Sequence, residues 1–288
     1  MAWHGSLDLD FRLQRFDGTP RTVGRASHEG PLRVLRSLYP EDPAVCHQVL
    51  VHPPGGIVGG DTLRLDVRLD VGAHALLTTP GATRFYRSAG ATARQSLEAR
   101  CGPGSRLEWL PLETLVHDGA RAVNTLRFAL EAGAETIGWD LLCLGMPVSG
   151  ETYTRGRFEQ RVEVIAPSGP AWLERGVLDF DDPRHAERTR RLLASPLGWD
   201  DHPVLGTLWF AAGAPLEERR REHLLEAARA ALPEELAGGA TAPHPNVIVV
   251  RALARRVEPL AEGLGAVRAA WRRGAWHLEA TLPRVWRT

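Results

Sequence analysis

Lysine is absent from this 288-residue chain, and all 35 of its basic residues are arginine. The absence excludes every mechanism that needs a lysine nucleophile, a Schiff base or the phosphate-binding lysine of a P-loop. The formal net charge is zero, because 35 acidic residues balance the arginines. No overall field therefore attracts nucleic acid or an anionic membrane, and we expect neither as a partner.

Cysteine is scarce as well, with three residues (Cys46, Cys101 and Cys143) far apart and no C-x-x-C pair. An odd, scattered set argues against a disulfide framework and fits a reducing compartment. No apolar run approaches the roughly 18 residues of a membrane span, and no early run is typical of a signal peptide. The sequence therefore predicts a cytoplasmic protein that does not cross a membrane.

Apolar and charged residues alternate most cleanly from Leu63 to Val71, which predicts a half-exposed strand. A weaker alternation predicts an edge strand over Leu7–Leu13. Glycine and proline turns separate further predicted strands, at 31–38, 73–79, 91–101, 106–110, 114–117, 122–131, 136–144 and 156–165. Many strands without intervening helices favour an all-β sandwich, a barrel or a helix-like coil of sheets.

The pattern changes after residue 180. Asp182 and Pro183 provide an N-cap and a first-turn proline for a helix to about residue 193. Further helices are predicted over 215–232 and 259–273, with a buried strand at 246–253. Because no linker or low-complexity tract interrupts the chain, we expect one domain over residues 1–288.

The most restricted stretch is the loop from Val49 to Asp61, which contains Gly55, Gly56, Gly59 and Gly60. We interpret it as a structural turn between two strands, with His52 and Asp61 at its shoulders. It does not match a nucleotide-binding loop, because a strand follows it where a phosphate cradle needs a helix.

Motifs for catalysis and stable metal binding are missing. The chain has no G-x-S-x-G, and none of its eleven histidines forms an H-x-H or H-x-x-x-H pair. We therefore predict no stable metal site. A transient site assembled from distant residues stays open, and its candidates are Cys46, His47, His52 and Asp61.

Three carboxylates lie in apolar surroundings: Asp61, Asp140 and Glu174. Burying a carboxylate is costly unless it is paired, hydrogen-bonded, hydrated or bound to metal. Two interpretations stay open. One is a set of structural ion pairs with available arginines, namely Arg84, Arg87 and Arg175, and the other is a water-filled polar channel.

Two further hypotheses concern single groups of residues. Trp271, Trp276 and Trp286 are either a partner-binding cluster or part of the core, because tryptophan is common in both. Asp61 and His52 could form the acid–base pair of a small-molecule hydrolase on a β scaffold. That alternative needs the two side chains within about 2.6–3.2 Å of each other.

Five blocks of sequence together resemble the UreD (UreH) family of urease accessory proteins. They occur in family order over nearly the whole chain, at Val51–Asp61, Thr78–Ser88, Leu107–Thr114, Trp139–Gly145 and Pro283–Thr288. In the second block this chain has Arg84 where the family often has lysine, so the charge is kept.

The resemblance implies a mainly β fold, a β-helix-like stack of sheets with a few α-helices in the C-terminal part. It implies a non-enzymatic scaffold that works with UreF and the GTPase UreG to insert nickel into apo-urease. It also implies a hetero-oligomer that is dimeric through UreF, and transient Ni²⁺ in place of a tightly bound cofactor.

In that family an internal polar passage is thought to conduct nickel. The matching positions here are Asp61, Thr83, Asp140 and Glu174, with Asp61 in the most specific motif. Single, spaced oxygen ligands suit such a passage, because a compact cage of cysteine and histidine would retain the ion.

Overall fold

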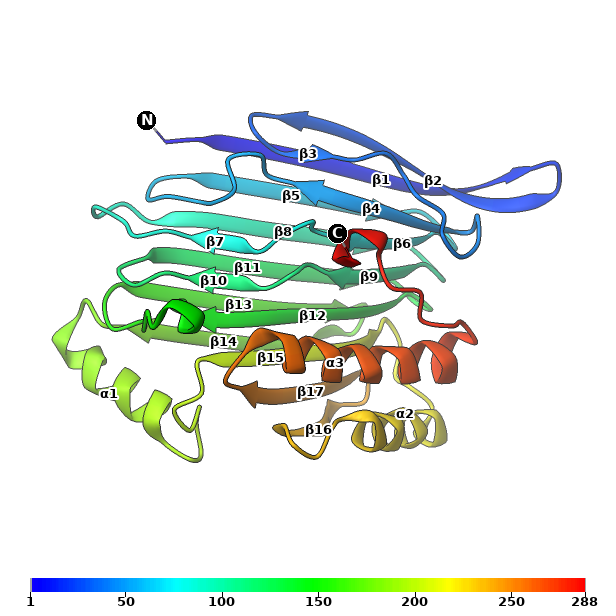
Figure 1. The fold of residues 1–288 in the computed structure, drawn as a ribbon. Coiled ribbons are helices and arrows are strands. Elements are labelled where there is room, and N and C mark those ends of the chain that lie inside the picture. Colours follow the sequence, from blue (N-terminus) through cyan, green and yellow to red (C-terminus); the bar gives the residue numbers. More distant parts are fainter. Residues whose placement is uncertain (1, 288) are drawn as a thin grey trace.

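The computed structural model describes residues 2–287, so Met1 and Thr288, the two ends of the predicted domain, lie outside the described residues. Two sheets face each other across a core, and helices lie along one side (Figure 1). The first sheet has the order β14-β13-β11-β8-β5-β1-β2. Its strands are β1 (His4–Phe16), β2 (Thr19–Glu29), β5 (Thr62–Leu69), β8 (Ala93–Cys101), β11 (Arg121–Leu130), β13 (Arg157–Ala166) and β14 (Gly169–Asp179).

The second sheet has the main order β16-β17-β15-β12-β9-β6-β4-β3, and β7 joins it through β10, which pairs with β12. Its strands are β3 (Arg33–Val34), β4 (Val45–Val51), β6 (His74–Thr78), β7 (Thr83–Phe85), β9 (Arg106–Leu110), β10 (Thr114–Val116), β12 (Glu135–Leu144), β15 (Val204–Ala212), β16 (Ala237–His244) and β17 (Val247–Ala254).

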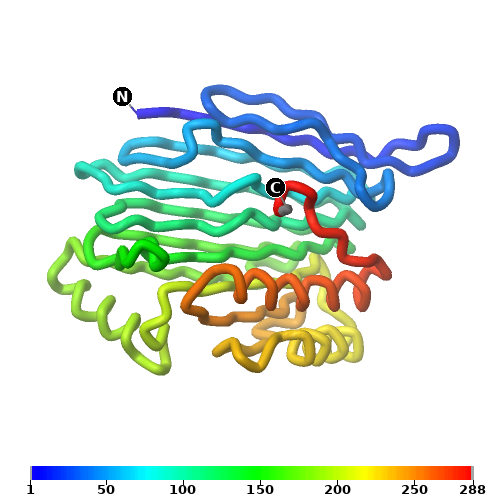
Figure 2. Tube along the Cα trace, viewed as in Figure 1, coloured from blue at the N-terminus to red at the C-terminus, as the bar shows by residue number. Residues whose placement is uncertain are grey.

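Consecutive segments alternate between the two sheets, so the chain coils as it advances (Figure 2). Strands β5, β8, β11 and β13 are parallel neighbours in the first sheet. Strands β4, β6, β9 and β12 are parallel neighbours in the second. The antiparallel strands β2 and β14 lie at the two edges of the first sheet. This arrangement confirms the predicted mainly β fold with a β-helix-like stack.

The alternation predicted for residues 63–71 is confirmed for residues 63–69 on β5, whereas Val71 lies beyond the strand and is exposed. Leu63, Leu65 and Val67 are buried between the sheets, whereas Arg64 and Arg68 point outward. Two predictions about strands were wrong. The segment Leu7–Leu13 is not at an edge, because β1 lies between β5 and β2, and the edge position belongs to β2. The strand predicted over 31–38 is only two residues long.

Within residues 2–287 there are three α-helices, α1 (Pro183–Ala194), α2 (Glu218–Ala231) and α3 (Val257–Trp271), and strands β15, β16 and β17 alternate with them along the chain. A π-helical turn at Arg272–Trp276 extends α3, and short 3-10 helices occupy Pro147–Ser149 and Arg284–Arg287. Asp182 caps α1 as predicted, since its side chain accepts a hydrogen bond from the Arg184 N–H at 2.9 Å.

A second apolar core lies between the second sheet and the helices α2 and α3. The side chains of Leu224, Leu260 and Leu264 are buried in it, against outward-facing residues of β12, β15 and β17. Strand β12 is therefore buried on both faces, which explains why its sequence is a nearly continuous apolar run. Across residues 2–287, no helix combines the length and apolar character needed to cross a lipid bilayer.

Candidate functional site

A cavity of about 260 Å³ lies between the two sheets. Its exposed lining includes Gly55 in one loop, Pro80 and Gly81 in another, and Arg84 on β7. Its buried lining comes from strands of both sheets and includes Asn124 on β11 and Asp140 on β12. The cavity therefore leads from surface loops to polar side chains in the protein interior.

The glycine loop at this entrance has a shape that only glycine fits. Gly55 and Gly60 have φ values of +75° and +95°, which other residues rarely adopt. A Cβ atom at Gly56 would lie 2.1 Å from the Tyr86 ring, and one at Gly59 would lie 2.2 Å from the Ser88 hydroxyl. These contacts are those of a tightly packed turn between β4 and β5.

Asp61 holds this loop in place. Its Oδ1 accepts a hydrogen bond from the Trp3 N–H at 2.7 Å, and its Oδ2 accepts one from the Val58 N–H at 3.0 Å. The side chain is buried, and two backbone donors compensate for the lost hydration of its charge. Asp61 thereby ties the loop to the N-terminal segment.

His52 lines the cavity beside this loop. Partial burial lowers the pKa of His52, and the nearby charge of Asp61 offsets part of that effect. The imidazole is therefore neutral at pH 7 and has a nitrogen lone pair available to a metal ion or a proton. No hydrogen bond or ion pair joins His52 to Asp61 among the described residues, so the contact required by the hydrolase alternative is not present.

Polar residues occupy matching positions on both sheets, where they interrupt the apolar core. In the first sheet, Asn124 on β11 is paired in register with Gln95 on β8 and with Gln160 on β13. In the second, Thr207 on β15 is paired with Asp140 on β12 and with Arg251 on β17. We call these six residues, together with Glu174 on β14, which binds Arg251, the inter-sheet polar layer.

Asp140 is the charged centre of this layer. Its Oδ2 accepts a hydrogen bond from the Gln160 Nε2, which joins the two sheets. Burial raises the pKa of Asp140 to about 6, with a further increase from the charge of Glu174 and a decrease from the Gln160 hydrogen bond. Asp140 is therefore mostly ionised at pH 7, although its side chain is almost completely buried.

A second link between the sheets lies further along the layer. Glu174 on β14 accepts a hydrogen bond from the Arg251 guanidinium on β17. The Arg251 side chain is 50% exposed and that of Glu174 is 25% exposed, so this end of the layer reaches solvent. Polar groups thus extend from the cavity through Asp140 to the protein surface.

Comparison with known proteins places the chain in a family. A family model described as UreD urease accessory protein matches residues 4–287. The chain belongs to the UreD family of urease accessory proteins. It is 62% identical to the urease accessory protein UreD of Methylibium petroleiphilum, 52% identical to that of Leptothrix cholodnii and 47% identical to that of Variovorax paradoxus. Each alignment covers 100% of both chains.

The structure of this UreD-family chain separates the four residues predicted to line a passage. Thr83 and Asp140 are among the residues that line the cavity, whereas Asp61 and Glu174 are outside that lining. Asp61 is engaged by backbone N–H groups, and Glu174 is paired with Arg251. Asp61, the residue whose motif matched the family best, is thus the loop's anchor in this geometry.

The pairing partners suggested for the buried carboxylates were wrong. None of Arg84, Arg87 and Arg175 pairs with Asp61, Asp140 or Glu174 among the described residues. Arg175 instead binds Glu159. Pairing across a sheet depends on register and on the chain's path, and neither can be read from the local sequence.

Sequence reasoning missed Gln95, Asn124 and Gln160, although a signal was present. Each lies on the inward-facing side of its strand, where the neighbouring residues are apolar. Gln95 is on the same side as Leu97 and Ala99, and Gln160 is on the same side as Phe158 and Val162. When an amide side chain takes a position that the alternation assigns to the core, it indicates a polar site in the protein interior.

Two of the three C-terminal tryptophans pack inside the protein. Trp271 is fully buried and donates to the Leu224 carbonyl, and Trp276 is buried and donates to Glu135. Their burial agrees with core packing and leaves no tryptophan surface at these positions for a partner. Trp286 is partly buried, stacks on Trp139 and donates to the Thr78 hydroxyl at 2.8 Å.

A buried ionic cluster attaches α3 and the π-helical turn to the second sheet. Glu108 on β9 accepts hydrogen bonds from Arg268, at 2.7 Å, and from Arg272, and His74 lies 3.2 Å away. Burial alone would raise the pKa of Glu108, but the two arginines and His74 hold it far below its usual range. Arg272 also binds Glu41. The cluster is structural, because its charges neutralise one another away from solvent.

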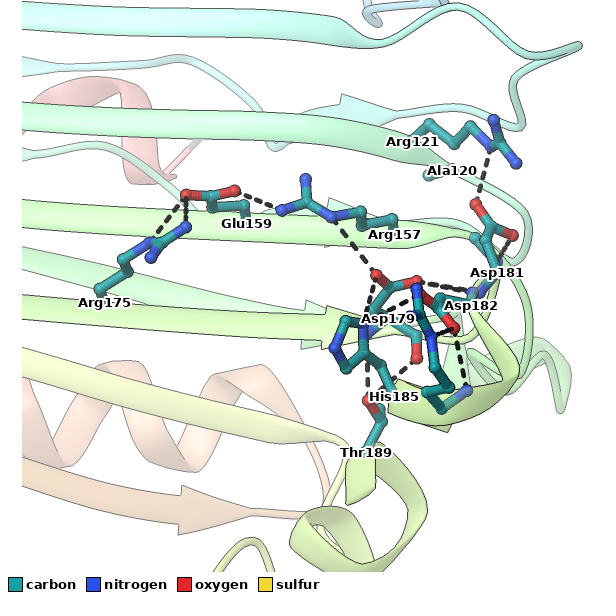
Figure 3. A network of polar contacts seen from close by, with 12 residues as sticks. Ala120, Arg121, Arg157, Glu159, Arg175, Asp179, Asp181, Asp182, His185 and Thr189 are labelled. Atoms are coloured by element: carbon teal, nitrogen blue, oxygen red, sulfur yellow. Dashed lines mark hydrogen bonds and ion pairs between the residues drawn. The ribbon is translucent and has the colours of Figure 1, made fainter. Parts of the chain in front are cut away.

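Another polar network lies near the N-terminus of α1 (Figure 3). Arg157 bridges Glu159 and Asp179, and the Asp179 backbone N–H donates to Thr189 at 3.0 Å. Arg121 pairs with Asp181. These contacts join α1 to the first sheet. Within residues 2–287, no group of three or more His, Cys, Asp or Glu side chains forms a ready-made metal site.

Proposed function

We propose that this UreD-family chain passes nickel toward apo-urease through the inter-sheet polar layer, as a scaffold and without a catalytic step. The observation that carries the proposal is the cavity that ends at Asp140, a buried carboxylate in a core that is otherwise largely apolar. A protein that needed only stability would fill this position with an apolar residue. The retained charge instead offers an oxygen ligand to a cation.

The ligands along the route are single and of different kinds. The neutral His52 imidazole and the Thr83 hydroxyl are at the cavity, Asp140 is at its inner end, and Glu174 is near the far surface. Nickel accepts nitrogen and oxygen ligands, and one protein ligand at a time holds the ion weakly. Water molecules that travel with the ion complete its coordination, so each position can release what it binds.

We further propose that the chain acts in the cytoplasm with UreF, UreG and apo-urease, in a hetero-oligomer that is dimeric through UreF. The family resemblance supports these partners, and membership in a family of urease accessory proteins supports the role in urease maturation. The partner-facing surfaces are not assigned, because Trp271 and Trp276 are buried.

The decisive experiment replaces Asp140 by asparagine, which keeps its size and a hydrogen-bond acceptor for Gln160 but removes the charge. The variant is co-expressed with apo-urease, UreF and UreG, and the nickel content and activity of the purified urease are measured. We expect both to fall about tenfold or more, the range seen when groups around a metal are altered. Glu226→Gln on the exposed face of α2 is the control. Normal nickel content in the Asp140→Asn sample would refute the route.

A further inference from the structure

The inter-sheet polar layer is interrupted at its centre. The cavity reaches Asp140, but Gln160, Thr207, Glu174 and Arg251 are outside its lining. In the first sheet, β13 lies between the cavity-lining strand β11 and the edge strand β14, and in the second sheet, β15 lies between β12, which carries Asp140, and β17. The hydrogen bond from Gln160 to Asp140 therefore crosses between the sheets at the point where the cavity stops.

The Gln160 side chain has one satisfied end and one unsatisfied end. Its Nε2 donates to Asp140, whereas its Oε1 is buried without a hydrogen-bond partner among the described residues. Leaving a buried carbonyl oxygen without a partner is unfavourable, so such groups are rare and call for an explanation. The amide oxygen and nitrogen share one carbon, and a half-turn of the amide exchanges their positions.

We propose that Gln160 is a rotating gate and a cation ligand for the route described above. Without a cation, the amide N–H holds the Asp140 carboxylate and closes the layer. A divalent cation at Asp140 repels the N–H and attracts the amide oxygen, so the side chain turns and Oε1 joins the carboxylate as a second oxygen ligand. The turn breaks the hydrogen bond between the sheets, and the far half of the layer opens toward Glu174.

This gate explains why an amide and not a carboxylate faces Asp140. A second carboxylate would repel Asp140 in the empty state and would bind a divalent cation more tightly. An apolar residue would neither satisfy Asp140 nor bind the ion. The amide N–H can donate to the Asp140 carboxylate when no cation is bound, and the amide oxygen can coordinate a bound cation, while the Gln160 side chain itself stays uncharged in both states.

The inference rests on the proposed function and is tested with Ni²⁺ as the probe and the full chain as the protein. Ni²⁺ binding is measured by equilibrium dialysis for Gln160→Met and Gln160→Glu. We expect Gln160→Met to weaken binding about tenfold and Gln160→Glu to strengthen it by a similar factor. In the co-expression assay, we expect both variants to lower the nickel content of urease, one through poor binding and the other through poor release.

Gln48 on β4 provides a matched control, because it is also a glutamine in the protein interior with one satisfied end and one unsatisfied end. Its Nε2 donates to the Ser37 hydroxyl at 3.0 Å, its Oε1 has no hydrogen-bond partner among the described residues, and it lies outside both the cavity lining and the inter-sheet polar layer. Gln48→Met and Gln48→Glu should leave Ni²⁺ affinity within about threefold of that of the unchanged protein. If Gln160 has only a structural role, both Gln160 variants should bind Ni²⁺ more weakly than the unchanged protein. A loss of Ni²⁺ affinity in Gln160→Glu would therefore contradict the gate.

The outcomes also separate the gate from the route. If Asp140→Asn abolishes Ni²⁺ binding and delivery while both Gln160 variants behave like their Gln48 counterparts, the gate is refuted and the route remains. If Asp140→Asn also leaves binding and delivery unchanged, the proposed function itself fails. Thermal unfolding of each variant, followed by circular dichroism, identifies a loss that comes from misfolding. The isosteric Gln160→Glu variant then decides the question if Gln160→Met does not fold.

Discussion

Asp140 should make the protein less stable at neutral pH than it would be with an uncharged residue. Burial and the charge of Glu174 raise its pKa from 3.8 to about 6 in the folded chain. The folded state thus binds the proton more tightly than the unfolded state, and stability is lost as the pH rises from about 4 to about 6. One pKa unit corresponds to about 1.4 kcal/mol, so the carboxylate costs about 3 kcal/mol at pH 7.

Asp140→Asn removes this cost and keeps the size of the side chain. Urea unfolding at pH 7.5 should show the variant more stable than the unchanged protein by up to about 3 kcal/mol. At about pH 4 the difference in stability between the two proteins should nearly vanish, because Asp140 is then protonated in the folded protein and no charge is buried there. A variant that gains stability but loses nickel delivery would indicate a charge kept for function.

Two results would refute this reasoning. If Asp140→Asn is less stable than the unchanged protein at pH 7.5, then the fold stabilises the carboxylate and the burial cost is offset. If the stability difference is the same at pH 7.5 and at about pH 4, the effect does not come from ionisation of Asp140. Asp70→Asn is a suitable control, because that carboxylate is largely exposed and should show little change.

The remaining predictions concern stability and the entrance loop. Glu108→Gln leaves the buried Arg268 without a charged partner and Arg272 with Glu41 alone, and should destabilise the fold by about 3–5 kcal/mol in urea unfolding. Trp286→Ala removes the stacking on Trp139 and the hydrogen bond to Thr78, and should cost about 2 kcal/mol by thermal unfolding. Asp61→Ala frees two backbone N–H groups, so their amide hydrogens should exchange with solvent at least about tenfold faster.

Each of these expectations has its own control and contradicting result. An equal loss in Glu108→Gln and in the exposed control Glu226→Gln would show that the buried cluster contributes little. Unchanged thermal stability in Trp286→Ala would mean that the tail is not held by its ring. Slow exchange in Asp61→Ala would show that other groups hold the loop. If Asp61→Ala leaves amide exchange in the loop unchanged but abolishes nickel delivery, then Asp61 belongs to the proposed route.

Alternation on β5 determined which residues of that strand face the core, because a strand with one buried face must place its apolar residues on a single side. The N-cap at Asp182 and the turn made by the loop glycines were also predictable, since both depend on neighbouring residues. The apolar run of β12 indicated burial, although its sequence could not show that the second buried face is covered by α3.

The site itself was only partly predictable. The sequence singled out Asp140, because a carboxylate in an apolar run is costly wherever the run is packed. It did not connect Asp140 with Gln160 or Glu174 with Arg251, because these partners are 20 and 77 residues apart. It also ranked Asp61 first, although one oxygen of that carboxylate binds the Val58 N–H of its own loop and the other binds the Trp3 N–H of the N-terminal segment.

The sequence alone determined many of the strands, the turns and the cost of each buried charge, because these depend on local patterns and on residue chemistry. Only the tertiary structure decided which polar groups meet. Coiling places β12 opposite β13, and the register then sets Asp140 against Gln160 at the inner end of the cavity. The same register brings Glu174 to Arg251 at the surface, so the polar groups on which the proposed route depends come together only in the folded chain.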